Sequence, residues 1–180
     1  MRVIAGVARG QPLAAPRDRG TRPITDRVKE TLFAILGERV PEARILDLYA
    51  GSGAIGIEAL SRGAAHATFV EQARTALAAL RANLERTRLS ELADVVPVDV
   101  ERFLAGVVGR SWDLVFLDPP YELRAIVAPL RAVELHLAPD AMIVVKHFWR
   151  TEMPEVPGLE SVRQRRFGET MLSFLEARGR

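Results

Sequence analysis

The sequence predicts an α/β fold built on a mostly parallel, seven-stranded sheet with helices on both faces. Apolar runs alternate with helical patterns after residue 40, and this alternation is typical of βαβ units that feed a parallel sheet. The chain closes with two short apolar runs around Phe167-Gly168, which predicts a hairpin at one edge of the sheet. The expected strands are Arg44–Tyr49, His66–Glu71, Ala93–Val98, Trp112–Leu117, Ala141–His147, Ser161–Arg166 and Met171–Leu175.

Helical patterns fill the intervals between the parallel strands. Helices are expected near Ala54–Arg62, Ala73–Arg86, Glu101–Val108 and Leu123–Leu137. Pro129 should kink or restart the last of these, because proline lacks an amide donor. Right-handed crossovers place functional loops at the carboxyl ends of the strands, so candidate site residues are sought there.

A short segment precedes the sheet. Thr25 or Asp26 can cap a helix that Gly37 ends, and the apolar positions of this helix form one stripe, Val28, Leu32, Ile35 and Leu36. Further upstream, Val3–Ala5 and Leu13–Ala15 flank a turn and predict a small β-hairpin. We therefore expect a hairpin arm in residues 1–20 and one catalytic domain in residues 21–180.

The composition is that of a globular protein, with 48% hydrophobic and 27% charged residues. No apolar run approaches the roughly 20 residues of a membrane span, and the N-terminus lacks the apolar core of a secretory signal. A cytoplasmic protein without membrane contact, and a monomer, is expected. The absence of cysteine excludes disulfides, and three scattered histidines argue against a bound metal.

Positive charge is concentrated at the N-terminus. Residues 1–29 contain seven basic and two acidic side chains, a balance of +5, so the remaining residues sum to −3. A basic segment on a mildly acidic body suits a phosphate backbone, although it is also compatible with a solvated arm that has no ligand. The residues expected to contact RNA are Arg2, Arg9, Arg17, Arg19 and Arg22.

A glycine-rich loop follows the first expected strand. Gly51, Gly53 and Gly56 match the pattern G-x-G-x-x-G, which permits a tight strand-to-helix turn and close approach of a ligand to the backbone. Glu71 closes the second strand, where such folds place the carboxylate that binds a ribose diol. The combination indicates an adenosine-containing cofactor without naming it.

Asp47 discriminates between the candidate cofactors. An acid four residues before the first glycine would repel the pyrophosphate of NAD(P) or FAD, whereas S-adenosylmethionine offers a sulfonium and an ammonium. We therefore favour the methyl donor over a dinucleotide or a purely structural turn. Tyr49 belongs to the same loop and is also expected to bind the donor. Asp99 can accept a hydrogen bond from the adenine amine, with the Val100 amide facing a ring nitrogen. Asp99 can equally cap the next helix.

The most specific motif is Asp118-Pro119-Pro120-Tyr121, at the end of the fourth strand. Two prolines hold the backbone extended and leave its carbonyls available. An exocyclic base amine is a poor nucleophile, because its lone pair is delocalised into the ring. Asp118 and the Pro119 carbonyl can accept its two hydrogens, and Tyr121 can stack on the base. The sulfonium methyl is already activated, so positioning supplies much of the acceleration.

Other polar and aromatic residues near this motif are interpreted as structural. Lys146, at the end of the fifth strand, is expected to be solvated. His147, Phe148 and Trp149 can widen a base pocket, although packing at the edge of the core is the preferred interpretation. Asn83 is also interpreted as structural.

With these residues in place, the chain resembles the RsmD family of 16S ribosomal RNA guanine-N2 methyltransferases over nearly its full length. The Thr-Arg-Pro segment and the helix that follows it are the most particular to that family. The matching motifs are Arg2-Val3-Ile4-Ala5-Gly6, Arg9-Gly10, Thr21-Arg22-Pro23-Ile24-Thr25-Asp26-Arg27-Val28-Lys29-Glu30-Thr31-Leu32-Phe33, Asp47-Leu48-Tyr49-Ala50-Gly51-Ser52-Gly53, Glu58-Ala59-Leu60-Ser61-Arg62-Gly63-Ala64, Phe69-Val70-Glu71, the Asp118 tetrapeptide and Phe167-Gly168-Glu169-Thr170.

The resemblance implies a class I, Rossmann-like methyltransferase fold, S-adenosylmethionine as donor, and one guanine of 16S rRNA as target, within the 30S subunit or an assembly intermediate. Three residues depart from the family pattern. Ile24 stands where Thr is common, Tyr49 where Phe is usual, and Lys146 where an acid is expected. The last departure concerns recognition of the base edge and does not affect the donor site.

Several alternatives stay open. The same tetrapeptide chemistry suits adenine-N6 methylation of DNA or RNA, or methylation of a protein glutamine amide, although the basic arm favours nucleic acid. A nucleic-acid-binding protein with an inactive methyltransferase fold is disfavoured, because all four acids of the expected site are present, Asp47, Glu71, Asp99 and Asp118. An NAD-dependent dehydrogenase would need a further substrate-binding region.

Overall fold

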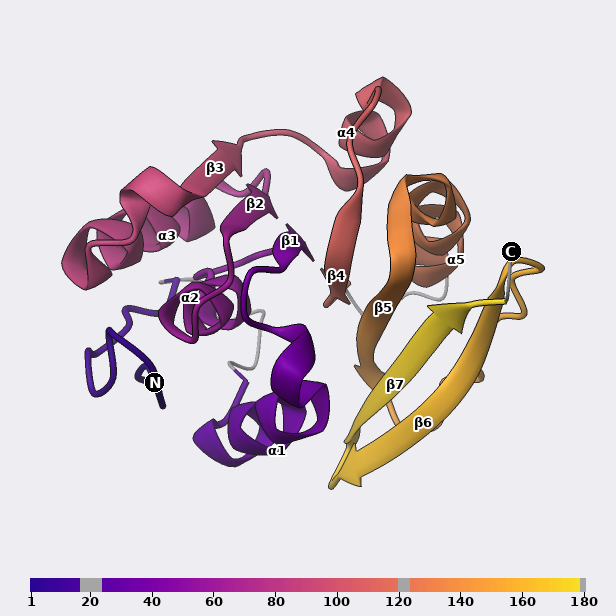
Figure 1. The fold of residues 1–180 in the computed structure, drawn as a ribbon, viewed down its shortest axis with the longest axis horizontal. Helices are drawn as coiled ribbons and strands as arrows, with labels where there is room; N and C mark the ends of the chain where they lie inside the picture. Colours follow the sequence, from indigo (N-terminus) through magenta and orange to yellow (C-terminus); the bar gives the residue numbers. More distant parts are fainter. Residues whose placement is uncertain (17–23, 120–123, 179–180) are drawn as a thin grey trace.

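The computed structural model describes residues 1–16, 24–119 and 124–178. Its centre is a seven-stranded sheet in the order β3-β2-β1-β4-β5-β7-β6 (Figure 1). The first five strands in the chain are parallel, and β7 and β6 form an antiparallel hairpin on the β5 edge. The strands are β1 Arg44–Leu48, β2 His66–Val70, β3 Ala93–Val96, β4 Trp112–Leu117, β5 Leu137–Phe148, β6 Leu159–Phe167 and β7 Thr170–Ala177. This sheet confirms the predicted fold class.

Helices cover both faces of the sheet (Figure 1). They are α1 Asp26–Leu36, α2 Ala54–Ser61, α3 Arg74–Thr87, α4 Val100–Gly106 and α5 Arg124–Val133, with short 3-10 turns at Gly37–Arg39, Ser90–Leu92 and Glu134–His136. Alternate strand residues face opposite layers, because successive side chains of a strand point to opposite sides. Ile45 packs in the cluster that includes residues of α1, α2 and α3, whereas Leu46 packs in the cluster that includes residues of α4 and α5.

The last predicted helix differs from the observed one. A helix over Leu123–Leu137 was expected to kink or restart at Pro129; α5 does not restart there but continues through Pro129, and it ends at Val133. A 3-10 turn follows, and β5 then begins at Leu137, four residues earlier than expected, because Leu137 pairs with Trp112 of β4. The register shifts between Trp112 and Leu114, so the pattern of the early part of β5 is irregular.

The N-terminal segment forms the expected small hairpin, in a different register. Arg2 and Pro12 form an antiparallel bridge, and the amide of Val3 donates to the Gln11 carbonyl at 2.9 Å. Downstream, the Thr25 hydroxyl accepts from the Val28 amide at 3.4 Å and so caps α1. Gly37, with a φ of 50°, ends the helix as expected.

The hairpin segment is tied to the domain by buried polar side chains. Glu58 of α2 accepts hydrogen bonds from the amides of Ile4 at 2.8 Å and Ala5 at 3.0 Å. Asn83 of α3 bonds both the amide and the carbonyl of Ala14, and it also donates to the Ser52 carbonyl. These bonds confirm the interpretation of Asn83 as a structural residue. In the part of the chain that the structure describes, no helix is long and apolar enough to cross a membrane.

Candidate active site

The glycine-rich loop joins β1 to α2 at the carboxyl edge of the sheet. Gly53 is the N-cap of α2 with a φ of 76°, a conformation that side chains rarely adopt. A Cβ at Gly56 would overlap the Phe69 ring, so this glycine permits close packing of the helix on β2. A Cβ at Gly51 would meet nothing closer than 4.0 Å, and this position therefore leaves room beside the backbone.

Asp47 lies beneath this loop. Its side chain is buried, and one carboxylate oxygen accepts a hydrogen bond from the Gly56 amide at 3.1 Å. Burial raises the pKa of Asp47 well above its usual value, the Gly56 bond opposes the rise, and the nearby carboxylates of Asp118 and Glu71 add to it. A cation bound above the loop would relieve this unfavourable electrostatic environment.

Glu71 follows β2 and lies against the same loop. One of its oxygens accepts from the Gly51 amide at 2.8 Å, and the other accepts from the amides of Gln72 and Ala73, each at 2.8 Å. These bonds hold the carboxylate beside the open side of Gly51. A diol that approached the loop would meet an oriented acceptor.

Asp99, Val100 and Tyr49 lie at the neighbouring strand ends. The Asp99 carboxylate accepts from the amides of Glu101 at 2.9 Å and Arg102 at 3.1 Å, so it caps α4, while the side chain is exposed. Val100 is the buried first residue of that helix. Burial raises the pKa of Tyr49 to about 12, with smaller contributions from the Asp99 and Glu101 carboxylates. The structure thus brings Tyr49 close to the end of β3.

Asp118 follows β4, the strand next to β1, and its side chain meets Lys146 from β5. The Lys146 ammonium lies 2.6 Å and 2.8 Å from the two Asp118 carboxylate oxygens. The prediction of a solvated Lys146 was wrong, because the parallel β4–β5 pairing brings the ends of the two strands together. Burial raises the pKa of Asp118, and Lys146 opposes that rise. Pro119 is buried, and Tyr121 lies outside the described residues.

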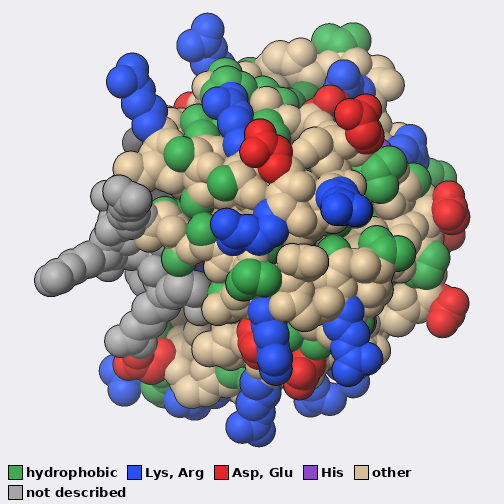
Figure 2. All heavy atoms as spheres, turned by 90° about the vertical axis from the view of Figure 1, so that its left-hand side faces the viewer, with side chains coloured by type: hydrophobic (Ala, Val, Ile, Leu, Met, Phe, Trp, Pro, Cys, Tyr) green, Lys and Arg blue, Asp and Glu red, His purple; other side chains and the backbone are tan. Residues whose placement is uncertain are grey.

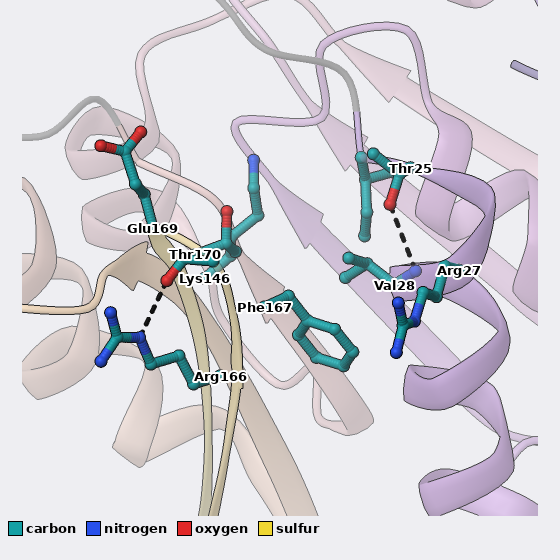
Figure 3. A pocket seen from close by; sticks show the side chains of 10 residues that line it. Thr25, Arg27, Val28, Lys146, Arg166, Phe167, Glu169 and Thr170 are labelled. Carbon is teal, nitrogen blue, oxygen red and sulfur yellow. Dashed lines mark hydrogen bonds between the residues drawn. The ribbon is translucent and has the colours of Figure 1, made fainter.

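A cavity of about 410 Å³ opens beside this ion pair (Figure 3). Lys146 lies at its boundary. The start of α1 forms one wall, and the turn between β6 and β7 forms the other. The cavity is lined by Ile24, Thr25, Arg27, Val28, Lys146, Arg166, Phe167, Gly168, Glu169 and Thr170. No local pattern connects these two segments, which lie about 140 residues apart in the chain.

The predicted RNA contacts are placed only in part. Arg2 is exposed and donates to the Asp26 carboxylate at 3.2 Å, and Arg9 is exposed, while Arg17, Arg19 and Arg22 lie outside the described residues. Figure 2 shows Lys and Arg side chains spread over the face that includes the N-terminal segment, with Asp and Glu side chains among them. Lys29, which contributed to the charge balance of +5, is fully buried. It is therefore not available to a phosphate.

Lys29 and Glu58 lie in the matching family motifs, but no pattern in the sequence indicated that they form a pair. Lys29 of α1 is paired with Glu58 of α2 at 3.3 Å, and both side chains have 0% exposure. Glu58 also accepts from Arg62 at 2.8 Å. Near the candidate site, His147 is buried, and its Nε2 lies 2.8 Å from the Ser173 hydroxyl, which confirms core packing for this residue. An alternation of polar and apolar residues cannot reveal such pairs, because their members come from different elements.

Comparisons with known proteins show the family to which the chain belongs. Residues 1–176 match the family described as "Conserved hypothetical protein 95". The chain is 39% identical to the protein named "Putative rRNA methyltransferase YlbH" of Bacillus subtilis, over 99% of this chain and 100% of that one. The chain belongs to the RsmD/YlbH family. This confirms the resemblance seen in the sequence.

Two further comparisons concern this family. "Ribosomal RNA small subunit methyltransferase D" of Escherichia coli is 40% identical, over 87% of this chain and 79% of that protein. The solved structure of a hypothetical protein from Thermus thermophilus superimposes with a TM-score of 0.84 at 34% identity, over 98% of this chain and 99% of that one. The fold is that of the class I methyltransferases, and the family is one of S-adenosylmethionine-dependent enzymes.

Proposed function

We propose that this protein transfers the methyl group of S-adenosylmethionine to the exocyclic N2 amine of a guanine in 16S rRNA, within the 30S subunit or an assembly intermediate. One observation carries the proposal. The Asp118 carboxylate follows β4, which pairs directly with the strand that leads into the glycine-rich loop. A donor on the loop and an amine at Asp118 would therefore be neighbours. The names of the family relatives favour ribosomal RNA as the substrate.

The donor site fits S-adenosylmethionine in charge and in space. Glu71 lies beside the loop, and Asp47 lies beneath it, where a bound sulfonium or ammonium would favour the ionised form of this buried carboxyl. Glu71 and Asp99 would serve the ribose diol and the adenine amine, and the open side of Gly51 would leave room for the ligand. The donor supplies a methyl group that its sulfonium already activates.

The residues of the chain would then hold the acceptor amine in line with that methyl group. The Asp118 carboxylate would accept one amine hydrogen and the Pro119 carbonyl the other, which favours the pyramidal nitrogen of the transition state, and Tyr121 would stack on the base. The nitrogen–carbon bond forms as the carbon–sulfur bond breaks, and the nitrogen then loses a proton to Asp118 or water. Lys146 donates to both Asp118 oxygens, and each oxygen keeps a second lone pair that the amine would use.

The test is transfer of tritiated methyl from S-adenosylmethionine to naked 16S RNA, 30S subunits, 50S subunits and DNA in parallel, followed by nucleoside analysis. We expect N2-methylguanosine only in samples that contain 16S RNA, and not in the 50S subunits or the DNA. Asp118→Ala should retain donor affinity in calorimetry and lose single-turnover methylation by orders of magnitude. Methylated adenine, or an Asp118→Ala variant as active as the parent, would contradict the proposal. Methyl transfer to a protein glutamine amide is the remaining alternative.

A further inference from the structure

We infer that the cavity between the start of α1 and the β6–β7 turn binds a nucleotide adjacent to the target base, with its phosphate at Arg27 and its base against Phe167. The inference rests on the proposed function and adds to it a separate place for the RNA strand. The donor residues lie at the ends of β1, β2 and β3, whereas this cavity lies beyond β5, on the opposite side of Asp118.

Its position relative to Asp118 is the first reason. Lys146 both lines the cavity and bonds the Asp118 carboxylate. A ligand in the cavity therefore lies one side chain away from the expected place of methyl transfer. An amine that donates to Asp118 would share this carboxylate with the Lys146 ammonium, which would gain from a further acceptor. A phosphate or a base oxygen in the cavity would provide one, so a ligand in the cavity would draw Lys146 toward itself and favour the bond between the amine and Asp118.

The chemistry of the lining is the second reason. Arg27 and Phe167 come from opposite walls and face the same space (Figure 3). Within the described ranges 1–16, 24–119 and 124–178, the Arg27 guanidinium makes no ion pair and no side-chain hydrogen bond, and the residue is exposed. Phe167 is half-buried, which leaves part of its ring accessible. A cation and an aromatic ring together suit a phosphate and a base.

Further arginines lie beside the cavity and along β6, on both faces of that strand. Arg166 stacks on the Trp149 ring at 3.7 Å from its centroid, and Arg150 lies over the same ring at 4.8 Å. Arg163 and Arg165 follow along β6, the edge strand, and both are exposed. Arginines on an edge strand can also simply prevent pairing with another chain. That role does not account for Arg27, which lies across the cavity on a helix.

The cavity has the size of a nucleotide site. Its volume of about 410 Å³ lies within the ~300–1,000 Å³ that is usual for small-ligand sites. The start of α1 belongs to the segment that is most particular to the family in sequence, and the Phe-Gly-Glu-Thr turn is also among the matching motifs. Two motifs without a role at the donor site thus form the two walls of one cavity.

The test compares Arg27→Ala with Arg81→Ala, a matched loss of one exposed arginine on α3 outside the cavity. Binding to 30S subunits containing unmodified 16S RNA is measured against salt, and methyl transfer is measured in parallel. We expect Arg27→Ala to weaken RNA binding about tenfold, to reduce the salt slope by about 0.7, and to raise KM with little change in kcat. Arg27→Lys should keep the slope, and Arg81→Ala should resemble the parent.

Phe167→Leu provides a second variant that retains apolar packing but loses the aromatic ring. It should weaken RNA binding about fivefold or more without changing the salt slope or the affinity for S-adenosylmethionine. If the parent methylates 30S subunits but Arg27→Ala binds them like Arg81→Ala, the nucleotide site is refuted and the proposed function stands. If the parent methylates no RNA, although it binds S-adenosylmethionine, the proposed function falls and this inference with it.

Discussion

Replacement of Glu58 by Gln tests how the N-terminal segment is held to the domain. The Glu58 carboxylate is fully buried and accepts four hydrogen bonds, from the Ile4 and Ala5 amides, Lys29 and Arg62. A glutamine keeps the shape of the side chain but turns one acceptor into a donor and removes the negative charge. Lys29 would then be a buried cation that has lost its ion-pair partner.

The expected cost is large for a single polar substitution. Breaking a buried ion pair by removal of one partner typically destabilises a protein by about 3–5 kcal/mol. For a chain of 180 residues, each kcal/mol shifts Tm by about 2–4 °C, so Tm should fall by roughly 6–20 °C. Desolvation already lowers the pKa of Lys29, and Glu58 opposes this effect. The penalty in the variant should therefore shrink as pH rises and Lys29 loses its proton.

Urea and thermal unfolding measure the loss, and hydrogen exchange at the Ile4 and Ala5 amides reports release of the segment. Glu85→Gln, an exposed acid on α3, is the matched control and should stay within about 0.5 kcal/mol of the parent. Lys29→Met combined with Glu58→Gln should recover part of the stability, because the fully buried uncompensated cation is then removed and Arg62 is partly exposed. A cost below about 1 kcal/mol for Glu58→Gln alone would refute the reasoning.

Three further predictions concern the donor, the acceptor and the N-terminal turn. Glu71→Ala should weaken S-adenosylmethionine binding by about 1.5–3 kcal/mol in calorimetry, and unchanged affinity in a folded variant would remove Glu71 from the donor site. Lys146→Met should raise the pKa of Asp118 further, because Lys146 opposes the effect of burial. As the pH is lowered, the variant should therefore lose single-turnover methylation at a higher pH than the parent. The same pH dependence in both proteins would contradict this prediction. Gly6→Ala should greatly lower Tm, since its Cβ would overlap the backbone of α2, whereas Gly10→Ala, with open space around it, should cost much less; equal losses would argue against the close approach.

Local patterns in the sequence were sufficient for the architecture and for the edge of the sheet where the site lies. The alternation of apolar runs with helical stripes predicted five parallel strands, and the carboxyl ends of parallel strands necessarily meet at one edge. That rule predicts that Asp47, Glu71, Asp99 and Asp118 lie along one edge of the sheet. Pro129 was less informative about the helix boundary, because it lies inside α5 and does not end the helix.

Only the tertiary structure decided the partners of the charged side chains. Lys29 contributed to a basic arm in the sequence, yet it is buried against Glu58, 29 residues further along the chain. Lys146 was expected to be solvated, yet it holds Asp118 from the neighbouring strand. The proposed nucleotide cavity likewise joins α1 to the last hairpin. Periodicity records which face of an element is buried, whereas the burial and pairing of a charge depend on how separate elements pack together.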